Sequence, residues 1–108
     1  MNEKIDIGIL GADGRMGQAV MRALKADPQL CLKVAITSHN SPNVGKDAHK
    51  TANLEPIGLM LSTNINDGLN LCDIIIDFSQ PEATLKTLSL MKESRCNTII
   101  TGTTGYSE

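Results

Sequence analysis

Three glycines recur at every third position near the start of the chain, within residues 8–17, G-I-L-G-A-D-G-R-M-G. An apolar run precedes them and an amphipathic stretch follows, so we expect a turn between a strand and a helix. Gly11 permits the tight turn, Gly14 keeps side-chain atoms away from an approaching pyrophosphate, and Gly17 lets the helix lie close to the strand. The amides at the start of that helix would then face phosphates. The spacing predicts a dinucleotide-binding turn; the alternative is a glycine-rich turn that binds nothing.

The residues after the second predicted strand bear on which dinucleotide is bound. In such folds a carboxylate about 20 residues after the glycines usually holds the adenosine ribose of NAD. Here the strand ends in Thr37 and Ser38, whose hydroxyls tolerate a 2′-phosphate, and His39, Lys46 or Arg15 could add positive charge. The sequence therefore predicts binding of NADPH or NADH with a mild preference for NADPH. The alternative is an ordinary polar loop.

Other polar residues of these segments carry no catalytic pattern. Asp13, within the glycine turn, is expected to point to solvent or to bond locally to the backbone, because contact with an anion would be unfavourable. His39 and His49 fall in the polar stretch 38–53 and are expected to be solvated loop residues, with cofactor contact as the weaker alternative. No spacing of ligand residues predicts a metal site. The absence of Lys-Ser/Thr after the glycines also argues against a Walker loop and nucleotide hydrolysis.

Two further segments follow predicted strands, residues 76–84 (I-D-F-S-Q-P-E-A-T) and residues 102–106 (G-T-T-G-Y). Because the carboxyl ends of parallel strands meet at one edge of a sheet, both segments should lie beside the glycine turn. The glycines of residues 102–106 allow close approach of a ligand, and the threonines offer hydroxyls and amides. We expect the nicotinamide half of the cofactor to lie there.

The elements that would position these residues follow from periodicity. Apolar runs predict strands at 5–10, 30–37, 59–61, 71–78 and 98–101. Helical spacing predicts helices at 15–26, 65–71 and 81–94. The alternation of strands and helices indicates right-handed crossovers and an α/β fold, a doubly wound parallel sheet of the Rossmann type. Residues 1–108 are expected to form one NAD(P)-binding domain.

The same periodicity assigns inner faces to two helices. The first is expected to bury Met16, Val20, Ala23 and Leu24, and the last to bury Leu85, Leu88 and Met91. Ser79 is expected to cap the last helix, with Pro81 in its first turn and Glu82 near its positive end.

Composition narrows the class of partner. Aromatic residues make up 2% of the 108 residues and the net charge is −2, so neither a stacking platform nor a basic surface for nucleic acid is expected. No signal peptide is recognisable and no apolar run reaches the roughly 18 residues of a membrane span. Three cysteines without a CxxC spacing are typical of reduced, packed thiols. We therefore expect a cytoplasmic protein.

The set G-A-D-G-R-M-G, D-F-S-Q-P-E-A-T and T-G-T-T-G-Y resembles the amino-terminal domain of the dihydrodipicolinate reductase family, along essentially the whole chain. The resemblance implies an oxidoreductase that transfers a hydride from NADPH or NADH to 4-hydroxy-tetrahydrodipicolinate, a cyclic dicarboxylate of lysine and diaminopimelate biosynthesis. It implies cofactor contacts from Gly11, Ala12, Asp13, Gly14, Arg15 and Met16 around the pyrophosphate, from Phe78 beside the nicotinamide ribose, and from Gly102, Thr103 and Thr104 at the nicotinamide. Thr37 and Ser38 stand where the family often has Glu-Arg, and Asp13 where a small or basic residue is common.

The resemblance also implies what this chain lacks. The family's catalytic histidine pair, its lysine and its carboxylate-binding Ser-Gly-Thr belong to a second domain that also forms the homotetramer, and none of these motifs occurs in the sequence. We therefore assign no catalytic residue, expect the chain to be a truncated and by itself inactive piece, and expect substrate binding only with the second domain. Two alternatives remain, another two-domain NAD(P) dehydrogenase and a non-catalytic NAD(H)-sensing regulatory domain.

Overall fold

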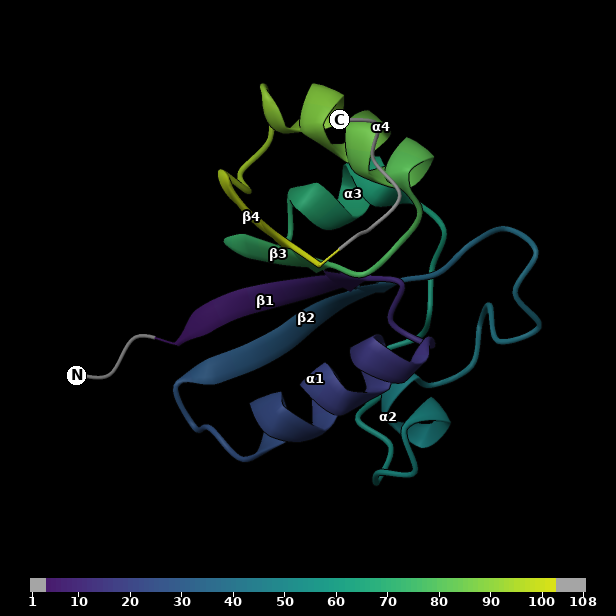
Figure 1. Cartoon of the computed structure of the whole chain (residues 1–108). Coiled ribbons are helices and arrows are strands. Elements are labelled where there is room, and N and C mark those ends of the chain that lie inside the picture. Colours follow the sequence, from purple (N-terminus) through teal and green to yellow (C-terminus); the bar gives the residue numbers. More distant parts are fainter. Residues whose placement is uncertain (1–3, 103–108) are drawn as a thin grey trace.

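A short parallel sheet lies at the centre of the chain, and helices cover both of its faces (Figure 1). The computed structural model describes residues 4–102. Its strands are β1 (Ile5–Leu10), β2 (Leu30–Ile36), β3 (Ile74–Asp77) and β4 (Thr98–Thr101). Its helices are α1 (Arg15–Lys25), α2 (Ala48–Thr51), α3 (Ile65–Leu69) and α4 (Pro81–Met91). The strand order β2-β1-β3-β4 and the parallel pairings confirm the predicted α/β class and the Rossmann-type sheet.

The central strand β1 divides the core into two layers. Ile7 and Ile9 pack in one apolar cluster with Met21 of α1. Leu10 packs in the other with Ile75 of β3 and with residues of α3. Figure 1 shows α1 and α2 on one face of the sheet and α3 and α4 on the other. A strand covered on both faces needs apolar residues throughout, which is why the continuous apolar run predicted it.

All four strands end at the same level of the sheet. Leu10 at the end of β1 is in register with Ile36 on one side and Asp77 on the other, and Asp77 is in register with Thr101. Parallel pairing therefore brings together the four segments that leave these strands. The glycine turn and the segments after β2, β3 and β4 meet at this carboxyl edge, as the sequence predicted.

Several predicted boundaries need correction. The expected strand at 59–61 is reduced to isolated bridges, since Met60 pairs with Asp47 and Ser62 pairs in parallel with Ile36 at the end of β2. The expected strand at 71–78 contracts to Ile74–Asp77, and the polar stretch 38–53 contains the short helix α2. Gln80, and not Ser79, precedes the first turn of α4. Pro81 and Glu82 occupy that first turn as predicted.

The buried face of α1 is rotated from the predicted one. Gly17, Met21 and Leu24 are buried, whereas Met16 is 55% exposed and Ala23 is exposed. Close packing at Gly17 sets this face, because a Cβ there would lie 2.3 Å from the carbonyl oxygen of Gly11. Only a glycine fits against the turn, so the helix presents that side inward and leaves Met16 beside the cleft.

Helix α4 also departs from its apolar periodicity. Thr84 and Thr87 are buried, while Leu85 is 60% and Leu88 44% exposed, contrary to the prediction. The Thr84 hydroxyl donates to the buried carboxylate of Asp77. A buried charge needs hydrogen-bond donors, and this requirement sets the inner face of the helix in place of its leucines.

Candidate functional site

The glycine turn has the backbone geometry that its spacing predicted. Gly11 has a φ of +77°, a conformation that side chains strain, and its N–H donates to the carbonyl of Ile36 at 2.9 Å. A Cβ on Gly11 would lie 2.8 Å from the carbonyl oxygen of Phe78. The Ala12 N–H also donates to Ile36, at 3.0 Å. The turn is thus fixed against the neighbouring strands β2 and β3.

Gly14 differs from its two neighbours in the motif. It precedes the first turn of α1 with φ −77° and ψ 173°, extended values that any residue adopts. A Cβ on Gly14 would meet only the carbonyl oxygen of Gly11, at 3.4 Å, which is ordinary contact. The fold therefore does not require glycine here. A requirement for glycine at this position must come from something that approaches the exposed side of the turn.

The amino end of α1 opens on the same side. The first N–H groups of a helix have no intrahelical acceptor, and Gly14 has no side chain that could accept from them. The amides of Arg15, Met16 and Gly17 are therefore available, and they lie at the positive end of the helix dipole. No acidic residue lies in this first turn. Such a helix end is suited to bind a phosphate group.

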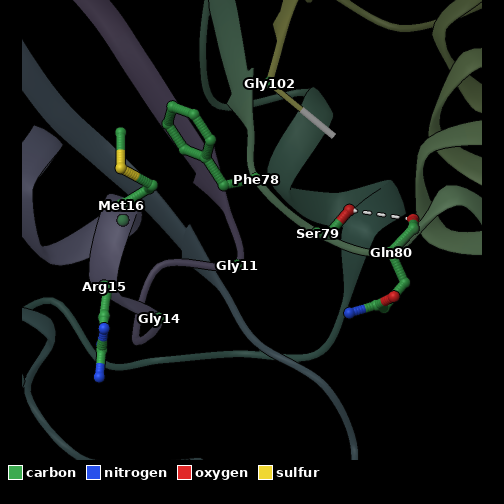
Figure 2. Close-up of a pocket in the computed structure, with 9 residues that line it drawn as sticks. Gly11, Gly14, Arg15, Met16, Phe78, Ser79, Gln80 and Gly102 are labelled. Carbon is green, nitrogen blue, oxygen red and sulfur yellow. Dashed lines mark hydrogen bonds between the residues drawn. The ribbon is translucent and has the colours of Figure 1, made fainter. Parts of the chain in front are cut away.

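A cleft runs along the carboxyl edge past this helix end. One part, a cavity of about 290 Å³, is lined by Gly11, Gly14, Arg15, Met16, Gly17, Phe78, Ser79, Gln80 and Gly102. Figure 2 shows the Phe78 ring and the Met16 side chain on one side of it and Arg15 pointing away from them. A second cavity of about 620 Å³ shares the turn and Phe78 with the first and extends to the segment after β2 and to α4. The two cavities adjoin at the glycine turn and Phe78, and the first residues of α1 line the smaller one.

Asp77 organises the part of the cleft between β3 and β4. Its side chain is fully buried and accepts from the Ser79 N–H at 2.8 Å, from the Ser79 and Thr84 hydroxyls, and from Thr101 Oγ1 at 3.2 Å. Its backbone carbonyl accepts from the N–H of Gly102 at 2.8 Å. One carboxylate thus ties the ends of both strands to the start of α4, and so positions the residues that line the cleft.

Phe78 and Gly102 pack directly on each other. A Cβ on Gly102 would lie 2.4 Å from the Phe78 ring, so glycine lets the ring lie over the backbone. The Phe78 N–H donates to the carbonyl of Leu10 at 3.0 Å, which holds the residue beside β1. The structure thus brings Phe78 and Gly102 together at the cleft. Thr103 and Thr104, which the sequence predicted beside them, lie outside the described residues.

Asp13 is placed only partly as predicted. Its carboxylate accepts the predicted local bond from its own backbone, but it also accepts from distant side chains, from Thr37 Oγ1 at 2.7 Å, Ser41 Oγ at 2.6 Å and Asn43 Nδ2 at 3.0 Å. Burial raises the pKa of Asp13, but the hydrogen bonds from Ser41, Asn43 and Thr37 outweigh it and hold this pKa below its usual value. Asp13 is therefore an ionised tether between the glycine turn and the segment after β2.

This tether changes the roles of the predicted residues after β2. Thr37 is 7% exposed, donates its hydroxyl to Asp13, and donates its N–H to the carbonyl of Ser62 at 2.8 Å. Ser38 and His39 are exposed and line the larger cavity. Of the two predicted hydroxyls, only that of Ser38 is exposed beside a ligand-sized space.

The prediction for the second histidine was wrong. His49 belongs to α2, is 6% exposed, and its Nδ1 is buried without a hydrogen-bond partner among the described residues. Asp47 accepts from the N–H groups of His49, Lys50, Ile57 and Gly58, which folds the segment into a helical turn against α1. The polar stretch 38–53 allowed a helical turn within a loop, but it did not indicate that His49 would be buried.

Some cleft residues were not among the predicted cofactor contacts, although two of them belong to the segment 76–84 that was predicted to lie beside the glycine turn. Ser79 and Gln80 line both cavities, and Lys86 of α4 lines the larger one. The first two follow Phe78 immediately, so the strand end that predicted Phe78 could also have predicted them. Within residues 4–102, no group of three potential metal ligands comes together. No helix in that part of the chain is long and apolar enough to cross a membrane.

Comparison with known families identifies relatives of this chain. The family model described as dihydrodipicolinate reductase, N-terminus, matches residues 5–108. A 4-hydroxy-tetrahydrodipicolinate reductase of Methylococcus capsulatus is 42% identical over 103 residues, which are 95% of this chain and 38% of the relative. The enzyme of the same name from Buchnera aphidicola is 33% identical over 108 residues, 100% of this chain and 40% of the relative. The chain thus spans well under half the length of these relatives.

Solved structures share the fold. Aspartate semialdehyde dehydrogenase with NADP from Candida albicans matches with a TM-score of 0.72 at 15% identity, over 94% of this chain and 30% of that one. Pyrroline carboxylate reductase with NADP bound, from Plasmodium falciparum, matches with a TM-score of 0.57 at 19% identity, over 94% of this chain and 35% of that one. At these identities the likeness concerns the arrangement of strands and helices.

Proposed function

Since the chain belongs to the dihydrodipicolinate reductase family, we propose that it is the NAD(P)-binding domain of a 4-hydroxy-tetrahydrodipicolinate reductase. One observation of the structure carries the proposal. The uncapped amino end of α1 opens into a cleft that also reaches Phe78 and Gly102 at the ends of β3 and β4. Family membership favours this reading over another dehydrogenase or a regulatory NAD(H) sensor.

The cleft residues fit a dinucleotide. The open side of Gly14 and the amides of Arg15 and Met16 would hold the pyrophosphate. Gly11 and Ala12 would set the turn beneath it. When bound, the nicotinamide supplies the hydride for reduction of an unsaturated cyclic dicarboxylate. These residues would bind and orient the cofactor at the carboxyl edge of the sheet.

The nicotinamide end would be shaped by residues after β3 and β4. Phe78 would pack beside the nicotinamide ribose, and Gly102 with Thr103 and Thr104 would contact the nicotinamide itself. The buried carboxylate of Asp77 would keep Phe78 and Gly102 in register. Of the described residues at this end, Asp77 accepts hydrogen bonds from Ser79, Thr84 and Thr101, so we assign it a positioning role and not that of a proton donor.

The choice between the two cofactors depends on the adenosine end of the cleft. Thr37 and Ser38 by themselves predict a mild preference for NADPH, since neither repels a 2′-phosphate. Asp13 adds a negative charge near them, because its carboxylate accepts from the Thr37 hydroxyl. Both cofactors are therefore included in the proposal.

Calorimetric titration of the 108-residue chain with NADH and NADPH tests cofactor binding. We expect measurable but weak binding, because the proposed second domain that would cover the nicotinamide is not part of this chain. A chain that is folded by circular dichroism but gives no heat with either cofactor would contradict the proposal.

The proposed reaction is tested by assaying the loss of NADH absorbance with 4-hydroxy-tetrahydrodipicolinate. The isolated chain should show no turnover, because we assign no proton donor among its residues and general acid catalysis alone contributes about 10²–10⁴-fold. A full-length protein containing this chain should turn over, as a homotetramer. Turnover by the isolated chain that matches the full-length protein would contradict the assignment of the chemistry to a second domain.

A further inference from the structure

The carboxylate of Asp13 is held beside the residue that follows β2. Asp13 Oδ1 lies 2.7 Å from Thr37 Oγ1, and Oδ2 accepts from Ser41 and Asn43 of the same following segment. The three donors come from 24 to 30 residues further along the chain. Side chains on both oxygens fix the position of the charge.

This position is the one that a dinucleotide-binding fold usually gives to an acidic residue. A carboxylate at the end of the second strand accepts hydrogen bonds from the adenosine ribose hydroxyls and repels a 2′-phosphate. In this chain β2 ends at Ile36 and Thr37 follows, with no carboxylate of its own. Asp13 delivers a carboxylate to the same place from the glycine turn. Three side chains and the backbone of Asp13 already donate to this carboxylate, so its effect on a bound cofactor comes from its fixed negative charge.

The remaining charges of this cavity do not reverse the effect. Glu82 and Lys86 of α4 line the same space of about 620 Å³ as Asp13, and His39 lies at its rim. Two carboxylates therefore share the cavity with one lysine. A 2′-phosphate, which carries about −1.5 to −2 charges at neutral pH, would enter a space with a surplus of negative charge.

We propose that Asp13 determines cofactor specificity, replacing the carboxylate missing from the end of β2 and making NADH the preferred cofactor. The inference rests on the proposed function, because it places the adenosine ribose between the glycine turn and Thr37. It replaces the mild NADPH preference predicted from Thr37 and Ser38, because that prediction lacked the negative charge of Asp13.

The test compares dissociation constants of NADH and NADPH for three forms of the chain by calorimetry. The natural chain should bind NADH at least tenfold more tightly than NADPH. Asp13→Asn removes the charge and should bring the ratio close to one, mainly by strengthening NADPH binding. Asp27→Asn is the matched control, because Asp27 is an exposed carboxylate at the opposite end of α1. The control should keep the ratio of the natural chain.

The outcomes separate the inference from the function on which it rests. Equal weakening of both cofactors by Asp13→Asn would show that Asp13 only supports the loop, and would overturn the inference alone. An NADPH preference in the natural chain would also overturn it. Failure of the natural chain to bind either cofactor would overturn the proposed function. Should Asp13→Asn not fold, Asp13→Ser and the loss of the natural preference at high salt test the same charge.

Discussion

Gly14 and Gly17 belong to one motif, but the structure predicts opposite consequences for replacing them. An added Cβ at Gly17 would lie 2.3 Å and 2.6 Å from the carbonyl oxygens of Gly11 and Ala12. Both are backbone atoms, so the turn or the helix must move. Overpacking of this kind costs about 1–3 kcal/mol or more, and Gly17→Ala should destabilise the chain by about 2 kcal/mol. It should weaken cofactor binding only as a consequence of the altered turn.

Gly14→Val should do the reverse. Its Cβ meets only Gly11 at 3.4 Å and its backbone conformation is extended, so the loss of stability should stay below about 1 kcal/mol. The isopropyl group would nevertheless occupy the space in front of the first amides of α1. We expect the affinity for NADH to fall at least tenfold, equivalent to about 1.4 kcal/mol.

Urea unfolding followed by circular dichroism and calorimetric titration with NADH distinguish the two effects. The prediction is a stable Gly14→Val that does not bind and an unstable Gly17→Ala. If Gly14→Val unfolded as readily as Gly17→Ala, glycine at position 14 would be a requirement of the fold. If Gly14→Val bound NADH like the natural chain, the pyrophosphate would not lie on this turn, and the reasoning would be refuted.

Three further predictions concern buried or tethered groups. Asp77→Ala should destabilise the chain by about 3 kcal/mol, because it removes the acceptor of the buried Thr84 hydroxyl and of the partly buried Ser79 N–H. Asp77→Asn should cost less, and urea unfolding measures both. Burial raises the pKa of Asp13 and of Asp47, but hydrogen bonds outweigh burial and hold both pKa values below the usual value. Each ionised carboxylate therefore stabilises the fold at pH values above the unfolded pKa of about 3.9. The contribution of these two carboxylates to stability should therefore be constant down to about pH 5 and decline as the pH falls below about 4. Urea unfolding of the natural chain and of Asp47→Asn as a function of pH measures it, and an equal acid dependence in both would contradict the contribution of Asp47. Burial, together with the neighbouring thiol of Cys96, raises the pKa of Cys72 to about 12. A thiol reagent at neutral pH should therefore label the half-buried Cys31 before Cys72, which peptide mass mapping would show.

The sequence by itself determined the order of the elements and the place of the cleft. Continuous apolar runs predicted the strands that form the sheet, because such strands are covered on both faces. The spacing of the glycines predicted the turn, because Gly11 has a positive φ and Gly17 packs in close contact with the turn, while Gly14 leaves its exposed side open. Parallel strands then bring Phe78 and Gly102 to the same edge without any further information.

Only the tertiary structure decided which side chains turn inward and where the charges lie. Thr84 of α4 is buried in preference to Leu85 because a carboxylate of β3 requires its hydroxyl. The partners of Asp13 lie 24 to 30 residues away, across a loop whose composition is merely polar. Periodicity reports the average environment of a helix face, and it contains no information about such pairs. Hydrogen bonds between distant side chains form only when the sheet has brought two strand ends together, and that is why the role of Asp13 could not be predicted from the residues around it.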